Sequence, residues 1–304
     1  SPAGARCTVS EPQAGGANST TYANQTPTIT AANQQVTVTN TFDVGTVRVT
    51  KVLQANGAGT SKQPWASGTF PVTLSCTKDF DGDGTAEQLT ISDATKTITG
   101  AGTASWANLP RGALCTVTEG TSVVTGQPQP AVSVSGAVTV AATQQTLVLT
   151  NNFTAGTLVV HKDITGDGVV WGTGPFSFSV NCTLAGVGTV FTAATTLTPA
   201  VGQTSLDSSA LGPIPIGSVC AVTETATAGA TSVATPDPVT IALDAATGNV
   251  TTVGVTNTFR NAGFTVAKSV TTGGAKDASG AAIGYRAAAF TASCTFRGTE
   301  VVPL

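Results

Sequence analysis

One lysine, one glutamate and one asparagine recur in the same order along this chain, each in a short run of alternating apolar and polar residues. The two full sets are Lys51, Glu119 and Asn151, followed by Lys162, Glu224 and Asn257. A neutral lysine amine can attack the side-chain carbonyl of asparagine while a protonated glutamate polarises that carbonyl and carries the proton. Ammonia leaves, and a neutral Lys-Asn isopeptide bond remains. These residue types therefore allow a self-catalysed cross-link.

This chemistry requires a dry site, and the spacing of the residues predicts one. Side chains of a strand alternate between its two faces, so Lys51 lies on the same face as Val47 and Val49. The glutamates and asparagines share faces with apolar neighbours in the same way. Burial lowers the pKa of lysine and raises that of glutamate, so both can be neutral near pH 7. A buried salt bridge capped by the amide is the alternative interpretation.

The elements that position these residues repeat along the chain. The pattern Thr-Asn-x-Phe occurs at residues 39–42, 150–153 and 256–259, and runs ending in lysine, in cysteine and in Cys-x-Val-x-Glu also occur three times. The period is about 105 to 112 residues, the size of an immunoglobulin-like sandwich. We expect complete modules at 43–154 and 155–260. Residues 1–42 would be the C-terminal part of one partial module, and residues 261–304 the N-terminal part of another.

Alternation with period two and frequent turn residues predict an all-β protein. The linkers between successive modules are only a few residues long, which is too short for free rotation. We therefore expect tandem immunoglobulin-like β-sandwiches stacked end to end as a semi-rigid rod.

The two partial modules hold the remaining members of the pattern. Glu11 and Asn40 lie in the first partial module, and Lys268 lies in the last. Cys7 and Cys294 have no partner of the expected kind within the chain. One hypothesis is a filament subunit whose two ends complement each other between copies in a heterologous contact. Against it, residues 294–304 and 1–7 together supply fewer residues than the corresponding stretch of a complete module.

At these residues the chain resembles the CnaB-type, or SpaA-like, modules of Gram-positive adhesins and pili. The resemblance rests on the order apolar-x-apolar-x-Lys, then Val-Thr-Glu, then Val-x-Asn. The cysteine pair and the Thr-Asn-Thr-Phe ending look most like a repeat of actinobacterial surface-anchored proteins. The resemblance implies that Lys51 joins Asn151 with Glu119 assisting, and that Lys162 joins Asn257 with Glu224 assisting.

The cysteines indicate an oxidising compartment. Cys76 and Cys115 occur once each in the first complete module, as do Cys182 and Cys220 in the second, and all lie on apolar faces. No Cys-x-x-Cys pair or histidine cluster is present, which favours disulfides over a metal site. Free buried thiols are the alternative.

One acidic turn has the spacing of a calcium loop. Asp79, Asp81 and Asp83 alternate, with Gly84 for the turn and Glu87 beyond. A plain acidic hairpin turn is the alternative, and residues 184–187 of the second module lack the pattern. Asp163, Thr165 and Asp167 form a weaker variant. No other cofactor is expected.

Composition excludes several classes of protein. Charged residues make up 10% of the chain, the formal net charge is −3 and no basic cluster occurs, so no nucleic acid partner is expected. No apolar run is long enough to span a membrane, and the absence of Met suggests an excised piece whose targeting signal or anchor lies elsewhere.

These features together predict a non-enzymatic structural stalk of a bacterial cell-surface adhesin or fibre. We expect an extracellular location, either attached to the cell wall or within a filament. Its partners would be further modules or neighbouring subunits, with an unknown host or surface ligand bound by a tip outside this segment. A ligand-binding module is a third hypothesis, for which Trp65, Trp106 and Trp171 are the candidate surface residues.

Overall fold

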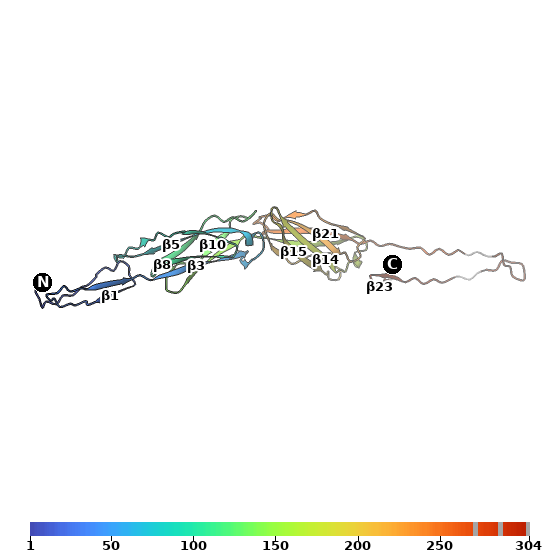
Figure 1. Cartoon of the computed structure of the whole chain (residues 1–304). Helices are drawn as coiled ribbons and strands as arrows, with labels where there is room; N and C mark the ends of the chain where they lie inside the picture. Colours follow the sequence, from blue (N-terminus) through green and yellow to red (C-terminus); the bar gives the residue numbers. More distant parts are fainter. Residues whose placement is uncertain (270–272, 285–287, 302–304) are drawn as a thin grey trace.

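A computed structural model describes residues 1–269, 273–284 and 288–301. The molecule is an elongated rod in which two β-sandwiches follow each other end to end (Figure 1). A narrow N-terminal segment (residues 1–43) precedes them, and an extended C-terminal segment follows, described over residues 261–269, 273–284 and 288–301. The predicted all-β class and end-to-end arrangement are confirmed.

The first sandwich consists of two five-stranded sheets that enclose its core. Its first sheet contains β3 (Val44–Ala55), β4 (Ala58–Gly59), β8 (Thr103–Pro110), β10 (Ala131–Val134) and β12 (Gln145–Phe153). Its second sheet contains β5 (Thr69–Lys78), β6 (Glu87–Gln88), β7 (Thr95–Thr99), β9 (Leu114–Glu119) and β11 (Val138–Thr139). One 3-10 turn, η1 (Trp65–Ser67), leads into β5.

The parallel pairing of the first and last strands positions the chemistry of this sandwich. Strand β3 lies beside β12 in parallel, with Lys51 opposite Leu149, so Asn151 follows two residues further along. Residues of β3 alternate strictly between buried and partly exposed. Lys51 falls on the buried face because it keeps the spacing of Val47 and Val49, which are fully buried.

The second sandwich repeats this plan. Its first sheet contains β13 (Gly156–Thr165), β16 (Ser205–Asp207), β17 (Leu211–Ile214), β19 (Ser232–Ala234) and β21 (Val250–Thr258). Its second contains β14 (Phe176–Leu184), β15 (Gly188–Leu197), β18 (Val219–Ala226) and β20 (Val239–Thr240), and the turn η2 (Val169–Trp171) precedes β14. Strands β13 and β21 pair in parallel with Lys162 opposite Val255, which is the same offset from the asparagine as in the first sandwich.

Direct contacts join the two sandwiches. The Asn56 side chain donates to the carbonyl of Ala155 and accepts from its amide, both at 3.0 Å. The Gln127 side chain reaches the carbonyl of Ile216 at 2.9 Å. The Lys62 amine lies 4.7 Å from the centre of the Phe191 ring. These contacts restrict rotation at the junction, as a rod requires.

The two ends carry short hairpins. Strands β1 (Ser19–Ala23) and β2 (Thr37–Thr41) pair in the N-terminal segment, and β22 (Cys294–Phe296) and β23 (Thr299–Val301) pair in the C-terminal segment. In the described part of the chain, no helix has the length and apolar character needed to cross a bilayer.

Candidate functional site

The first set of residues forms one connected cluster inside the first sandwich. The Lys51 amine donates to both Glu119 Oε2 and Asn151 Oδ1. The amide nitrogen of Asn151 donates to Glu119 Oε1 at 2.6 Å. Lys51 is 1% exposed, Asn151 is fully buried and the Glu119 side chain is 1% exposed. One carboxylate, that of Glu119, therefore contacts both the Lys51 amine and the Asn151 amide, and the amine lies beside the amide carbonyl that it would attack.

Burial changes the acidity of this lysine. Removal from water lowers the pKa of Lys51 to about 8, although Glu119 acts in the opposite direction. The Phe70 ring lies with its centre 4.5 Å from the amine and forms the apolar floor of the site. About a tenth of the amine is therefore neutral at pH 7, far more than for an exposed lysine.

Sequence reasoning missed Ser122, which completes the cluster. Ser122 is 4% exposed and donates from Oγ to Glu119 Oε1 at 2.6 Å. The amide nitrogen of Asn151 also lies 3.4 Å from this Oγ. A hydroxyl residue three positions after the glutamate was the available signal, and the second set has Thr227 at the same spacing.

The second set lies at the equivalent place with different contacts. The Lys162 amine is 3.6 Å from Glu224 Oε1 and donates to the carbonyl of Val255 at 3.3 Å. The amide nitrogen of Asn257 donates to Glu224 Oε1 at 2.8 Å and to the carbonyl of Thr227 at 3.2 Å. Lys162 and Asn257 are both fully buried.

Two acceptor atoms of the second set are buried without a hydrogen-bond donor among the described residues. They are Glu224 Oε2 and Asn257 Oδ1. Burial lowers the pKa of Lys162 to about 8 and raises the pKa of Glu224. Desolvation by burial thus acts against the charged form of both side chains.

The partial sets occur at the two ends of the rod. In the N-terminal segment the Asn40 amide donates to Glu11 Oε1 at 2.9 Å, and Thr20 donates to Asn40 Oδ1 at 2.7 Å. Lys268 lies in the C-terminal segment and is exposed. Among the described residues, the glutamate and asparagine therefore come together with no hydrogen bond from a lysine.

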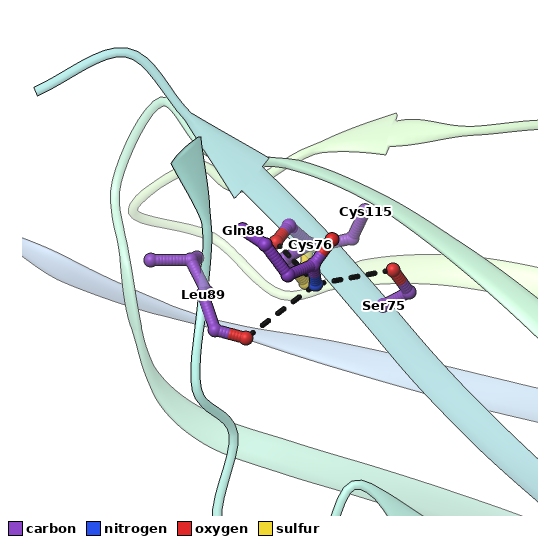
Figure 2. Close-up of a disulfide and its surroundings, with 5 residues drawn as sticks. All are labelled: Ser75, Cys76, Gln88, Leu89 and Cys115. Carbon is purple, nitrogen blue, oxygen red and sulfur yellow. Dashed lines mark hydrogen bonds between the residues drawn. A yellow bond between two sulfur atoms is a disulfide. The ribbon is translucent and has the colours of Figure 1, made fainter. Parts of the chain in front are cut away.

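Two disulfides cross-link the described residues. Cys76 of β5 is joined to Cys115 of β9, and Cys182 of β14 to Cys220 of β18. Figure 2 shows the first, where the Gln88 amide donates to the carbonyl of Cys76 at 3.1 Å. Both bonds lie in the second sheet of their sandwich, opposite the sheet that carries the lysine and the asparagine. Cys7 and Cys294 are free and half-buried.

The acidic loop gathers its four carboxylates. One oxygen from each of Asp79, Asp81, Asp83 and Glu87 lies within 4.8 Å of the others. The amides of Gly82 and Gly84 donate to Asp79 and lower its pKa. Carboxylate oxygens are the ligands that Ca²⁺ prefers. Calcium binding stays a prediction.

The interpretation of the tryptophans as a binding surface is wrong for two of them. Trp65 is fully buried and Trp106 is 3% exposed, because each lies on the inner side of its sandwich. Trp171 is half-buried and packs against Phe296, with ring centres 6.1 Å apart. Two of the three tryptophans proposed for a ligand-binding surface are therefore not accessible to a ligand.

His161 is partly exposed on the outer side of β13. Its Nδ1 lies 2.6 Å from Asp207, and its Nε2 lies 3.3 Å from Asp163 and 3.2 Å from the Ser205 hydroxyl. The hydrogen bond to Asp207 raises the pKa of His161. Asp163 and Ser205 both lie at Nε2, so the imidazole is held between two carboxylates and a hydroxyl on the outer surface.

Comparison with known families places the chain. A family profile described as "Domain of unknown function (DUF5979)" matches residues 1–43, 47–154 and 158–260. The chain therefore belongs to this family. No curated protein matches it.

Several solved structures are similar to the chain at low identity. The major pilin of Streptococcus pyogenes is 13% identical, with a TM-score of 0.36, over 72% of this chain and 100% of the pilin. Two B repeat units of the collagen-binding protein of Staphylococcus aureus are 17% identical, with a TM-score of 0.32, over 74% and 52% of the two chains. The Bacillus anthracis TIE protein is also 17% identical, with a TM-score of 0.32, over 76% and 38%. Similarity this low does not carry the function of those proteins to this chain.

Proposed function

We propose that this chain is a structural stalk segment of a bacterial cell-surface adhesin or fibre, clamped inside each complete sandwich by a Lys-Asn isopeptide bond. The observation that carries the proposal is the buried contact of Lys51 with both Glu119 and Asn151. A charged lysine is costly to bury, and its neighbour here is an amide that it can convert into a neutral product. In a plain salt bridge, the asparagine would serve only as a hydrogen-bond partner of Lys51 and Glu119.

The reaction balances within the cluster. The neutral Lys51 amine attacks Cγ of Asn151, so a new C–N bond forms while the bond from Cγ to Nδ2 breaks. Glu119 Oε2 faces the amine and takes its proton, and Oε1 faces the amide nitrogen and returns a proton to it. Ammonia leaves. The rigid core supplies the proximity that an enzyme would otherwise provide.

The bond would lie where a stalk carries load. Strand β3 opens the first sandwich and β12 closes it, and the two are parallel neighbours. Tension entering along β3 would pass from Lys51 directly to Asn151. The stretch of chain between these two residues, which are 100 positions apart, would then not extend under tension. The disulfides would tie the opposite sheet in the same way.

The matching partners and location follow from this role. The chain would act outside the cell, attached to the wall or within a surface filament. Neighbouring modules or subunits would contact its ends, and a tip outside this segment would bind the host or surface ligand.

Single-molecule stretching tests the proposed role. Pulled from its ends, the wild-type chain should not release the stretch between Lys51 and Asn151. While the Cys76–Cys115 disulfide keeps 39 of these 100 residues closed, Asn151→Ala should add on the order of 210 Å of extension, at about 3.3 to 3.6 Å per residue. Thr146→Ala, on the exposed face of the same strand, is the matched control and should extend like the wild type. Full extension of the wild-type sandwich would refute the clamp.

A second candidate is a filament subunit in which the ends of two copies combine. The hydrogen-bonded pair of Glu11 and Asn40 and the exposed Lys268 favour it. It predicts ladders of linked copies that survive reduction and boiling, and that disappear in Lys268→Ala. A chain that stays a single species under these conditions would exclude it.

A further inference from the structure

The loop after β9 differs from the loop after β18, although the two strands match as far as the glutamate. Strand β9 ends at Glu119, and the following residues fold back. Strand β18 continues past Glu224 to Ala226. The third residue after the glutamate is therefore placed differently in each sandwich.

In the first sandwich this residue faces the glutamate. Ser122 Oγ lies between Glu119 Oε1, to which it donates at 2.6 Å, and Asn151 Nδ2, from which it is 3.4 Å away. In the second sandwich the equivalent contact to Asn257 comes from the backbone carbonyl of Thr227, at 3.2 Å. No side-chain hydroxyl donates to Glu224 Oε1 there among the contacts of the described residues, and Glu224 Oε2, the counterpart of the Glu119 atom that accepts from Lys51, has no donor in the same part of the chain.

A second side chain holds Ser122 in place. Gln129 accepts from the Ser122 amide at 3.0 Å and donates to the Ser122 carbonyl at 2.8 Å. These two bonds fix the backbone of Ser122 on both sides, so its hydroxyl is aimed by the loop and not by chance rotation. Such support around reacting groups is what preorganised sites require.

We propose that Ser122, held by Gln129, is the positioning residue for cross-linking in the first sandwich, where it orients the Glu119 carboxylate between Lys51 and Asn151. This proposal rests on the isopeptide reaction proposed above. The hydroxyl fixes the rotation of the carboxylate, so that Oε2 faces the amine and Oε1 faces the leaving nitrogen. It also keeps the Asn151 amide nitrogen directed toward Oε1.

The test follows cross-linking in newly synthesised chain that is released from cell-free translation directly into denaturant, before it can react, and is then refolded by dilution. Intact mass counts ammonia losses, and peptide mapping assigns each to its sandwich. Ser122→Ala should slow the loss from the first sandwich about tenfold, as expected for a hydrogen bond to a charged group. The second sandwich of the same molecule should react at the wild-type rate. Ser122→Thr should restore most of the rate, and Gln129→Ala should slow it to a smaller extent.

A matched variant separates positioning from general loosening. Val124 lies in the same loop and packs against a core cluster that includes Trp65. Val124→Ala should lower the melting temperature and leave the rate unchanged. An unchanged rate in Ser122→Ala, or an equal slowing in Val124→Ala, would overturn the proposal while the cross-link itself stands. No ammonia loss from the wild-type first sandwich would overturn both.

Discussion

The two sandwiches place the same three residue types on equivalent strands but arrange them differently. In the first, the lysine amine contacts both the glutamate and the asparagine. In the second, Lys162 binds the carbonyl of Val255 and lies 3.6 Å from Glu224. Parallel pairing of first and last strands is the same in both, so the strands alone do not set the final contacts. The loop after the glutamate strand also differs, since the Ser122 hydroxyl contacts Glu119 in the first sandwich and the backbone carbonyl of Thr227 contacts Asn257 in the second.

This difference has an energetic side. Each buried polar atom without a partner costs about 1 to 3 kcal/mol, and the second set has two, Glu224 Oε2 and Asn257 Oδ1. Protonation of Glu224 and approach of the neutral amine would relieve these costs. The first set already has the contacts that the proposed reaction needs, whereas in the second set the Lys162 side chain would have to move before it could react.

The largest expected effect comes from removing either acceptor asparagine. Closing a loop of about 100 residues stabilises a fold by about 5 kcal/mol in the chain-entropy model. Asn151→Ala and Asn257→Ala should each destabilise their own sandwich by about that amount in denaturant unfolding. A loss of stability in the first sandwich alone would show that only the first set reacts. No loss in either sandwich would contradict cross-linking in both.

Removing a disulfide should have a somewhat smaller effect, and an equal one in both sandwiches. The paired cysteines are 39 and 38 residues apart, for which the same model gives up to about 4 kcal/mol. We expect this loss for the double change of Cys76 and Cys115 to alanine, and for that of Cys182 and Cys220. Calorimetry of each variant measures it. Unequal losses would place part of the asymmetry in the second sheet.

The order and pH dependence of cross-linking sharpen the comparison further. After refolding, the first sandwich should lose ammonia before the second, because Lys162 must first leave Val255.

Both lysines have a pKa lowered to about 8, so the neutral fraction of the amine increases about tenfold per pH unit up to pH 8 and then levels off. Both rates should follow that curve. A rise that continues toward the ordinary lysine value of 10.5 would contradict burial of the amines.

The smallest expected effect concerns calcium and the first sandwich only. Its loop holds four carboxylates within 4.8 Å, whereas the turn at residues 184–187 has none. At ten times the dissociation constant, calcium would stabilise the first sandwich by about 1.4 kcal/mol. The change of Asp81 and Asp83 to asparagine should abolish this shift in melting temperature. An equal shift in both sandwiches would rule out this loop as the cause.

Much of the architecture could be predicted because strand alternation determines which residues face inward. Lys51, Asn151, Lys162 and Asn257 are buried for that reason. The role of Ser122 could not be predicted, since it depends on where β9 ends and how the next loop folds back. The prediction that Trp65 and Trp106 are exposed is wrong because large aromatic side chains stabilise the fold most when they are buried, and the turn and strand that carry them direct them inward.

Intact mass of the purified wild-type chain, under denaturing and reducing conditions, tests the central claim most directly. Each isopeptide bond removes one ammonia, about 17 Da, through the amide-exchange chemistry described above. We expect two losses, which peptide mapping assigns to the pair Lys51 and Asn151 and the pair Lys162 and Asn257. A mass equal to that of the unmodified sequence would contradict the account and leave two buried salt bridges.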